Sequence, residues 1–229
     1  MKISGLQKVS LIDYPGKISA VVFTQGCNFR CPYCHNPELV DPERFEACMD
    51  EQVILNFLES RLKKLDGVTI TGGEPTLQAD LEFFCAKIKK MGYLLKIDTN
   101  GSHPMVLDNL LKRNLLDYIA MDIKGPMDMY EKVTQTKVNT EDVLKSVALV
   151  MKSGCKYEFR TTLVSPLLTR DHILQIDNVI HGANRFIMQR CQTVKCLKPN
   201  LVSSNGFPEN DLREMKMQFS RTIKEVLIR

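Results

Sequence analysis

The sequence predicts an α/β fold in which parallel strands alternate with covering helices. Short runs rich in β-branched residues alternate with longer amphipathic stretches, the alternation repeats about six times, and a polar cluster follows several of the strands in turn. Such a sheet either lies open and doubly wound or curls toward a barrel, and in both cases ligands bind at the carboxyl ends of the strands.

The individual elements are predicted from local patterns. The first strand covers residues 18–24 (ISAVVFT), and the later strands are the apolar runs at 67–72, 93–101, 116–125, 157–164 and 184–190. Helices are expected at 50–66, 81–92, from Pro104 onward, and at 140–154, 170–180 and 209–227. Thr140 is the expected N-cap of its helix, Pro104 suits a first helical position, and Gly92 suits a helix end.

The composition is that of a single globular domain. The chain has 229 residues, 44% hydrophobic and 25% charged, and 31 basic against 27 acidic residues give a net charge of +4. This small, scattered excess argues against a nucleic-acid surface, and no secretory or membrane-spanning run is visible. We therefore expect one cytoplasmic domain over 1–229, with a core of about 17–190 and a C-terminal helical extension of about 208–227.

Polar residues cluster after four consecutive predicted strands. Three cysteines follow the first strand, Thr71–Pro75 (TGGEP) the second, Asp98–Gly101 (DTNG) the third and Asp122–Gly125 (DIKG) the fourth. Because the carboxyl ends of parallel strands share one edge of the sheet, these clusters should meet there and form a binding site.

Cys27, Cys31 and Cys34 form the spacing C-x3-C-x2-C. Disulfides are disfavoured in a long chain without an export signal, so clustered thiols indicate a metal or redox chemistry. Structural zinc usually takes four ligands from two separated pairs, and His35 directly follows Cys34, which makes it a poor fourth ligand. Three thiolates instead suit an iron–sulfur cube with one open iron, and structural zinc is the alternative.

This triplet, with Tyr33 before its third cysteine, resembles the signature of radical S-adenosylmethionine enzymes. YCHNP at residues 33–37 is similar to the subset that activates glycyl-radical enzymes. The segment at residues 11–40 (LIDYPGKISAVVFTQGCNFRCPYCHNPELV) most closely resembles the activating proteins of anaerobic ribonucleoside-triphosphate reductase. The resemblance extends to about residue 165 and is loose beyond it, so the partner-docking surface there stays unassigned.

The resemblance implies an open, partial (β/α)6 TIM-like barrel holding a [4Fe–4S] cluster on the three cysteines and S-adenosylmethionine on its open iron. Reductive cleavage of S-adenosylmethionine would give a 5′-deoxyadenosyl radical, which removes hydrogen from a glycine of a partner enzyme. The implied partners are anaerobic ribonucleoside-triphosphate reductase and a flavodoxin- or ferredoxin-type electron donor.

The resemblance also implies roles for individual residues. Gly72, Gly73 and Glu74 would receive the methionine amino group, and Tyr33 would pack near the adenine. The remaining implied contacts to S-adenosylmethionine, in part through a monovalent cation, come from five strand-end residues: Asp98, Asn100, Asp122, Lys124 and Arg160. Taken singly, the acids could equally be N-caps, the glycines a tight turn, and Arg160 an interior ion pair with Asp122 or Glu158.

The remaining thiols and the histidine beside the triplet receive simpler interpretations. Cys48, Cys85 and Cys155 stand alone and are expected to be buried small hydrophobes. Cys191 and Cys196 are expected to be free thiols, with a metal or disulfide role as the alternative. His35 should hydrogen-bond to backbone, since homolytic cleavage needs no general base.

Other functions remain open at this stage. The chain could activate another glycyl-radical enzyme of the pyruvate formate-lyase type, or act directly on a small molecule or peptide. A non-catalytic zinc-binding module is the remote alternative.

Overall fold

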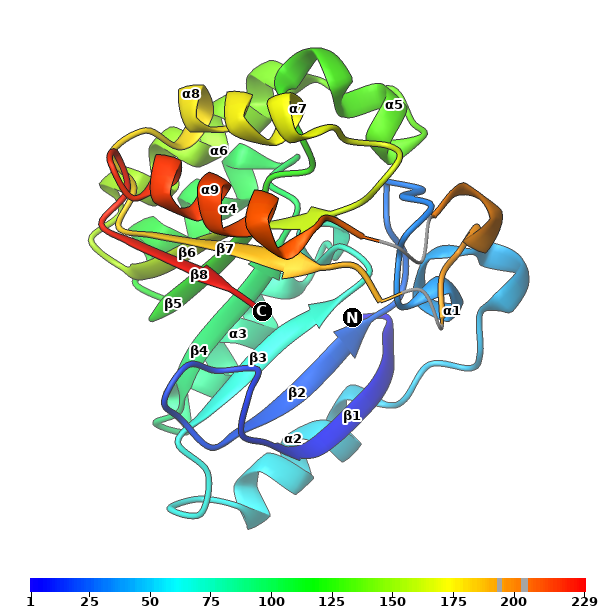
Figure 1. Ribbon diagram of the computed structural model, residues 1–229. Coiled ribbons are helices and arrows are strands. Elements are labelled where there is room, and N and C mark those ends of the chain that lie inside the picture. Colours follow the sequence, from blue (N-terminus) through cyan, green and yellow to red (C-terminus); the bar gives the residue numbers. More distant parts are fainter. Residues whose placement is uncertain (193–194, 203–205) are drawn as a thin grey trace.

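The computed structural model describes residues 1–192, 195–202 and 206–229, and within them eight strands form one sheet in chain order, β1 to β8 (Figure 1). β1 runs antiparallel to β2, and all later neighbours pair in parallel. The strands are β1 (Ile3–Ser10), β2 (Ser19–Thr24), β3 (Gly67–Gly72), β4 (Leu94–Thr99), β5 (Tyr118–Asp122), β6 (Lys156–Leu163), β7 (Arg185–Arg190) and β8 (Glu225–Ile228).

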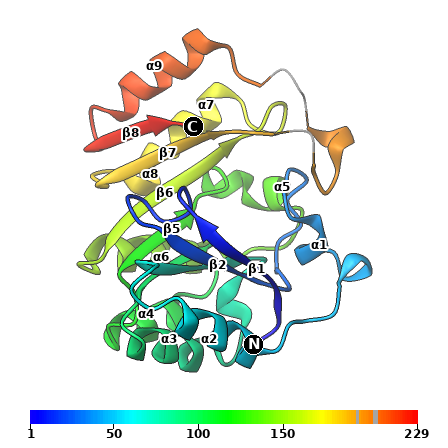
Figure 2. The same cartoon turned by 90° about the horizontal axis from the view of Figure 1, so that it is seen from below.

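Helices connect the parallel strands and cover the sheet (Figure 2). The edge strands β1 and β8, both wholly described, do not pair with each other, so the curled sheet remains an open, partial barrel. The α-helices are α1 (Pro37–Val40), α2 (Glu51–Ser60), α3 (Leu81–Lys90), α4 (Pro104–Lys112), α5 (Tyr130–Thr134), α6 (Thr140–Lys152), α7 (Arg170–Gln175), α8 (Asp177–Ile180) and α9 (Glu209–Phe219). This architecture confirms the predicted fold class.

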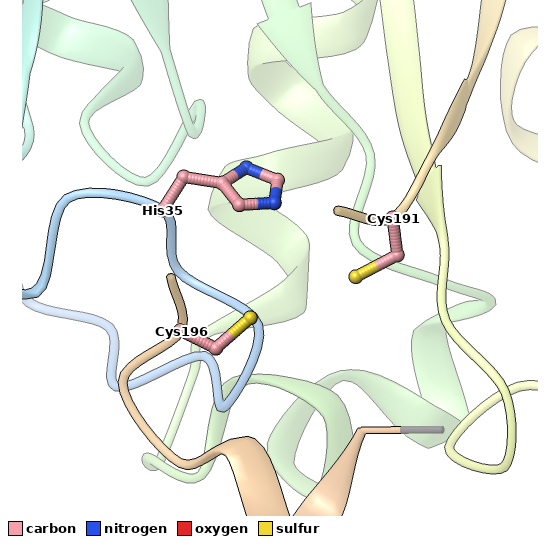
Figure 3. Close-up of side chains that lie close together, drawn as sticks. All are labelled: His35, Cys191 and Cys196. Atoms are coloured by element: carbon pink, nitrogen blue, oxygen red, sulfur yellow. The ribbon is translucent and has the colours of Figure 1, made fainter. Parts of the chain in front are cut away.

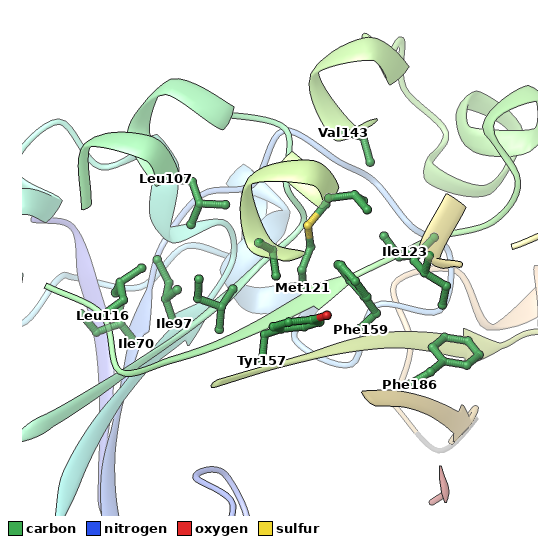
Figure 4. Close-up of a cluster of buried hydrophobic side chains, with 14 of the residues drawn as sticks. Ile70, Ile97, Leu107, Leu116, Met121, Ile123, Val143, Tyr157, Phe159 and Phe186 are labelled. Atoms are coloured by element: carbon green, nitrogen blue, oxygen red, sulfur yellow. The ribbon is translucent and has the colours of Figure 1, made fainter. Parts of the chain in front are cut away.

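The core lies between the strands and their helices. Ile70, Ile97 and Phe159 from the sheet are fully buried, and Leu107 of α4 and Val143 of α6 pack into the same cluster (Figure 4). Each such side chain contributes roughly 1.5–3 kcal/mol relative to exposure. Buried apolar residues thus form most of the core face of the parallel strands, although Lys96 of β4 and Glu158 of β6 are buried within their strands.

The six predicted strands correspond to β2–β7, and Pro104 is the first residue of α4 as expected. Two local predictions were wrong. The N-cap of α6 is Asn139, whose side chain accepts a hydrogen bond from the Glu141 amide, and Thr140 is already helical. The helix expected at 170–180 is divided into α7 and α8.

The two edges of the sheet were not foreseen. The predicted C-terminal helix at 209–227 ends at Phe219, and the chain then adds β8 alongside β7. The Thr222 hydroxyl donates to the Asp177 carboxylate at 2.5 Å and helps fix the turn between α9 and β8. Apolar residues continue at helical spacing into β8, so the hydrophobic pattern alone does not show where the helix stops.

Within the described ranges, none of the helices has the length and apolar character needed to cross a membrane.

Candidate functional site

The residues predicted for the site lie together at the carboxyl ends of the strands. They line one cavity of about 360 Å³, a volume within the range of small-molecule sites. The predicted residues in its lining are Cys27, Cys31, Tyr33, Cys34, Gly72, Gly73, Glu74, Asp98, Asn100, Asp122, Lys124 and Arg160. The register of the strands brings these residues together, because Thr24 pairs with Gly72 and Asp122 pairs with Arg160.

The three cysteines lie on the loop that follows β2. Cys31 is buried, and Cys27 and Cys34 are half-buried. The Cys34 amide donates to the Cys31 carbonyl at 3.0 Å, and the Arg30 guanidinium donates to the Cys27 carbonyl at 2.6 Å. These backbone contacts fold the loop so that all three thiols reach the cavity.

Burial keeps these thiols protonated when no cation is near. It raises the pKa of Cys27 to about 12 and of Cys31 to about 11, and it also raises the pKa of Cys34. Metal ligation requires thiolates, so a bound cation must displace these protons. Three soft ligands converging from one short loop fit an iron–sulfur cube that leaves one iron without a protein ligand.

Gly72 and Gly73 are required by close packing against the end of β2 and the loop that follows it. A Cβ atom on Gly73 would lie 2.0 Å from the Gly26 carbonyl oxygen, and one on Gly72 would lie 2.4 Å from the Thr24 amide nitrogen. Gly72 also has φ +118°, in the region that favours glycine. The two glycines therefore let the β3 end contact the loop that carries the cysteines.

The Glu74 carboxylate accepts hydrogen bonds from residues at the ends of β3 and β4. Its side chain is 1% exposed and caps the short 3-10 helix Pro75–Leu77 by accepting from the Thr76 amide at 3.0 Å. It also accepts from the Thr99 hydroxyl at 2.8 Å and from the Asn100 amide at 2.7 Å. Burial raises its pKa although these donors oppose that rise. Glu74 is therefore the N-cap of this short helix, a role that the sequence had suggested only for Asp98 and Asp122, and its hydrogen bonds join β3 to β4.

Two aspartates and three cations form an ion-pair network across the ends of β4, β5 and β6. Arg160 contacts Asp122 through Nε at 2.8 Å and Asp98 through Nη1 at 3.1 Å, and Lys124 contacts Asp122 at 2.9 Å. Lys96 pairs with the other oxygen of Asp98. Burial disfavours the carboxylate of Asp122, but Arg160 and Lys124 hold its pKa well below its usual range. The interior ion pair considered for Arg160 is thus present with Asp122, and it includes Asp98 in place of Glu158.

Tyr33 is buried against the same network. Burial raises its pKa well above the ordinary value, and its hydroxyl has no well-aligned hydrogen-bond partner among the described residues. A buried hydroxyl that lines a cavity without a partner is a group that a ligand can satisfy.

Other residues at the site escaped sequence reasoning. Asn28, inside the cysteine triplet, accepts from the Asn100 side chain at 2.9 Å and donates to the Ser102 hydroxyl at 2.9 Å. Asp13 and Gln189 also line the cavity. Asn28 and Asp13 both lie within the segment at residues 11–40 that the sequence analysis had singled out, so a signal was available for them. Gln189, at the end of β7, offered none.

The remaining cysteines differ from one another. Cys85 is buried as predicted and Cys155 is half-buried, but the prediction for Cys48 was wrong. Cys48 is exposed because it lies in the extended segment before Met49, where its thiol contacts the Gln25 side chain at 3.6 Å. All eight cysteines are free.

His35 hydrogen-bonds to backbone, as expected: Nε2 lies 2.9 Å from the Gln192 carbonyl oxygen. Its ring lies beside Cys191 and Cys196, which come from the segment after β7 (Figure 3). Nothing in the local sequence linked these residues.

Comparison with known proteins places this site in a family. Residues 21–180 match the radical SAM superfamily. A Methanocaldococcus jannaschii protein, provisionally named a glycyl-radical enzyme activating enzyme, is 34% identical over 99% of this chain and 95% of its own length. The pyruvate formate-lyase-activating enzyme of Clostridium pasteurianum is 32% identical over 99% of this chain and 98% of its own length.

A solved structure shows the same fold. Streptococcus suis SuiB bound to S-adenosylmethionine superposes with a TM-score of 0.67 at 14% identity, over 90% of this chain and 51% of SuiB. Radical SAM enzymes use a [4Fe–4S] cluster and S-adenosylmethionine, and the donor set of the cavity fits both. The chain belongs to the radical SAM superfamily and, within it, to the glycyl-radical enzyme activating enzymes.

Proposed function

We propose that the partner of this activating enzyme is anaerobic ribonucleoside-triphosphate reductase. The proposal is carried by the position of the segment at residues 11–40, whose sequence resembles the activating proteins of that reductase. It forms the cysteine loop, and its Asp13 lines the cavity. Leu11 (72% exposed) and Ile12 (81% exposed) line an adjoining pocket that shares Asp13 with the cavity. Exposed apolar side chains at a cavity mouth suit contact with a protein.

The cysteine loop would hold the cluster through Cys27, Cys31 and Cys34. When bound, the reduced cluster and S-adenosylmethionine together supply the radical that abstracts hydrogen from a glycine. The role of this chain is to bind the cluster and S-adenosylmethionine, to orient them and to exclude water from them. The burial of Cys31 and the contact between Gly73 and the cysteine loop serve that purpose.

The strand ends would hold S-adenosylmethionine. Lys124 and Arg160 supply positive charge for its carboxylate, while the β3 end at Gly72, Gly73 and Glu74 supplies acceptors for its amino group. Tyr33 offers an aromatic face and an unsatisfied hydroxyl to the adenosine part. The further polar groups in this proposal are Asp98, Asn100 and Asp122, with a monovalent cation as an additional ligand of the acids.

We place this activity in the cytoplasm, where eight free thiols remain reduced. The electron donor in this proposal is a flavodoxin- or ferredoxin-type protein. A net charge of +4 favours docking of an acidic donor.

Pyruvate formate-lyase is a second candidate partner. It is favoured by the Clostridium pasteurianum relative, whose name states activation of that enzyme and whose length is covered almost completely.

The test is to incubate the anaerobically reconstituted chain with S-adenosylmethionine, dithionite and either reductase or lyase from the same source. We expect the electron paramagnetic resonance doublet of a glycyl radical on the reductase only. A doublet on the lyase with none on the reductase would contradict the assignment and select the second candidate.

A further inference from the structure

A second group of metal-binding side chains lies next to the cysteine triplet. We propose that His35, Cys191 and Cys196 bind one zinc ion. This inference goes beyond the proposed function, because it needs neither S-adenosylmethionine nor a partner enzyme.

The three side chains point toward one another across a long separation in sequence (Figure 3). His35 follows the last cysteine of the triplet, whereas Cys191 and Cys196 follow β7. One ligand atom from each residue lies within 4.8 Å of the other two. Ligands of one tetrahedral zinc ion, with bonds of about 2.0–2.3 Å, lie about 3.5–3.8 Å apart. Small side-chain rotations would therefore bring all three onto one ion.

The Gln192 carbonyl oxygen lies among the three ligand atoms. It is 2.9 Å from His35 Nε2, 3.3 Å from Cys196 Sγ and 3.9 Å from Cys191 Sγ. These separations bracket the edge of about 3.4–3.6 Å between an oxygen and the nitrogen or sulfur ligands of a tetrahedral zinc ion. The carbonyl oxygen thus stands where a fourth ligand, or a water molecule that replaces it, would complete the coordination.

The chemistry of the ligands selects the ion. Two thiolates and one imidazole suit borderline-soft zinc, while hard cations such as magnesium and calcium prefer oxygen. The cysteine triplet of the main site differs, since it offers three sulfurs and no nitrogen. Both cysteines of the second group are free, so neither is withdrawn into a disulfide.

A zinc ion here would fasten the segment after β7 to the cysteine loop. The two segments already contact each other through backbone: Leu197 donates to the Cys34 carbonyl at 3.1 Å, and Lys198 donates to the Pro32 carbonyl at 2.8 Å. A salt bridge between Lys195 and Glu38 at 2.8 Å adds to this contact. The ion would hold the wall of the cavity beside the third cysteine of the triplet.

The test is metal analysis of the holoenzyme, produced and purified anaerobically in medium containing iron and zinc. We expect about one zinc per wild-type chain alongside a full cluster. Cys191→Ser, Cys196→Ser and His35→Asn should each lose at least about tenfold of the bound zinc and keep the iron, as tenfold or greater losses are common when ligand shells are broken. Cys48→Ser, which alters an exposed thiol elsewhere, should keep both metals.

Zinc X-ray absorption on the wild-type holoenzyme tests the site without any variant. The expected shell contains two sulfurs at about 2.3 Å and nitrogen or oxygen at about 2.0 Å. Wild-type protein with a full cluster and no zinc, zinc retained in Cys191→Ser, or a shell of three or more sulfurs would overturn the proposal. Iron in place of zinc at these residues would overturn the identity of the ion.

Discussion

The two groups of cysteines at this site differ in how the chain assembles them. Cys27, Cys31 and Cys34 come from one loop of eight residues, and burial sets the protonation of each thiol. Cys191 and Cys196 reach their place only because β7 ends beside the cysteine loop, where His35 meets them. The first group is a local motif and the second is a product of the fold.

The two groups therefore have different roles: we expect the triplet to carry the reaction and the second group to support the structure of the cysteine loop. The triplet follows β2 and lines the same cavity as Arg160 and Lys124 of the charged network. In the second group His35 is exposed, Cys191 is half-buried and Cys196 is buried, and all three side chains lie near the Gln192 carbonyl oxygen. We therefore expect substitutions in the triplet to remove the reaction, and substitutions in the second group to change metal content and the rigidity of the loop.

The largest expected effect is the loss of the cluster when a triplet cysteine is replaced. Cys34→Ala should reconstitute with little iron and without the broad visible absorption of a [4Fe–4S] cluster, because two thiolates cannot hold it. Cys85→Ala removes a buried thiol outside the cavity and should keep both iron and absorption. Equal iron contents in the two variants would contradict the assignment of the ligands.

A steric change next to the cysteine loop should weaken the site almost as strongly, although it leaves all three cluster-binding cysteines in place. Gly73→Ala places a methyl group 2.0 Å from the Gly26 carbonyl oxygen, so the cysteine loop must move away from β3. Gly5→Ala, where the nearest atom is 3.8 Å away, is the matched control. We expect at least a tenfold loss of affinity for S-adenosylmethionine for Gly73→Ala alone, measured by equilibrium binding to the reconstituted proteins. Unchanged affinity would show that the loop tolerates the shift.

The contrast between local motif and fold also explains what the sequence could predict. The strand-end residues Gly72, Asp98 and Asp122 are separated by helices of ordinary length, so parallel pairing alone predicted that they would meet. The strands β2–β7 were identifiable because each carries buried apolar, often β-branched or aromatic, residues between helical segments, even though β4 and β6 also bury Lys96 and Glu158. The edge strands are less regular: β1 has exposed residues in its second half, and β8 continues a helical pattern.

Long-range side-chain contacts could not be predicted in the same way. The approach of His35 to Cys191 depends on where β7 ends relative to the cysteine loop, which no local pattern encodes. The same holds for Asn28 and Asn100, whose hydrogen bond joins the cysteine loop to the β4 end. By contrast, the partner of Arg160 was partly foreseeable, because Asp122 ends the neighbouring strand.

The charged network should contribute a moderate amount to stability. Arg160→Met removes two hydrogen-bonded ion pairs, but Lys96 and Lys124 still contact the two aspartates. We therefore expect a loss of about 2–3 kcal/mol in the free energy of unfolding, below the cost of leaving a buried charge wholly unpaired. Urea unfolding at pH 7 measures this loss, and Arg190→Met, at an exposed pair with Glu209, should cost less than about 1 kcal/mol. A similar loss of unfolding free energy in both variants would contradict a stabilising role for the buried network.

The smallest expected effect is on acid stability. The folded-state pKa of Asp122 lies below its ordinary value of 3.8, so its contribution is complete above that pH and is lost as pH falls through the folded value. Arg160→Met should raise this pKa toward the ordinary value. The stability difference between wild type and variant, measured by urea unfolding of the cluster-free chains, should therefore shrink between pH 5 and about pH 2. A difference that stays constant would mean that Asp122 does not respond to Arg160.

The most direct test of the central assignment is the formation of 5′-deoxyadenosine from S-adenosylmethionine by the reconstituted, dithionite-reduced protein. Wild type, Cys34→Ala and Cys191→Ser should be assayed together, because they separate the two groups of cysteines. We predict product from wild type and from Cys191→Ser, and none from Cys34→Ala. Product that survives in Cys34→Ala, or its absence from wild type with a full cluster and partner enzyme present, would contradict the assignment.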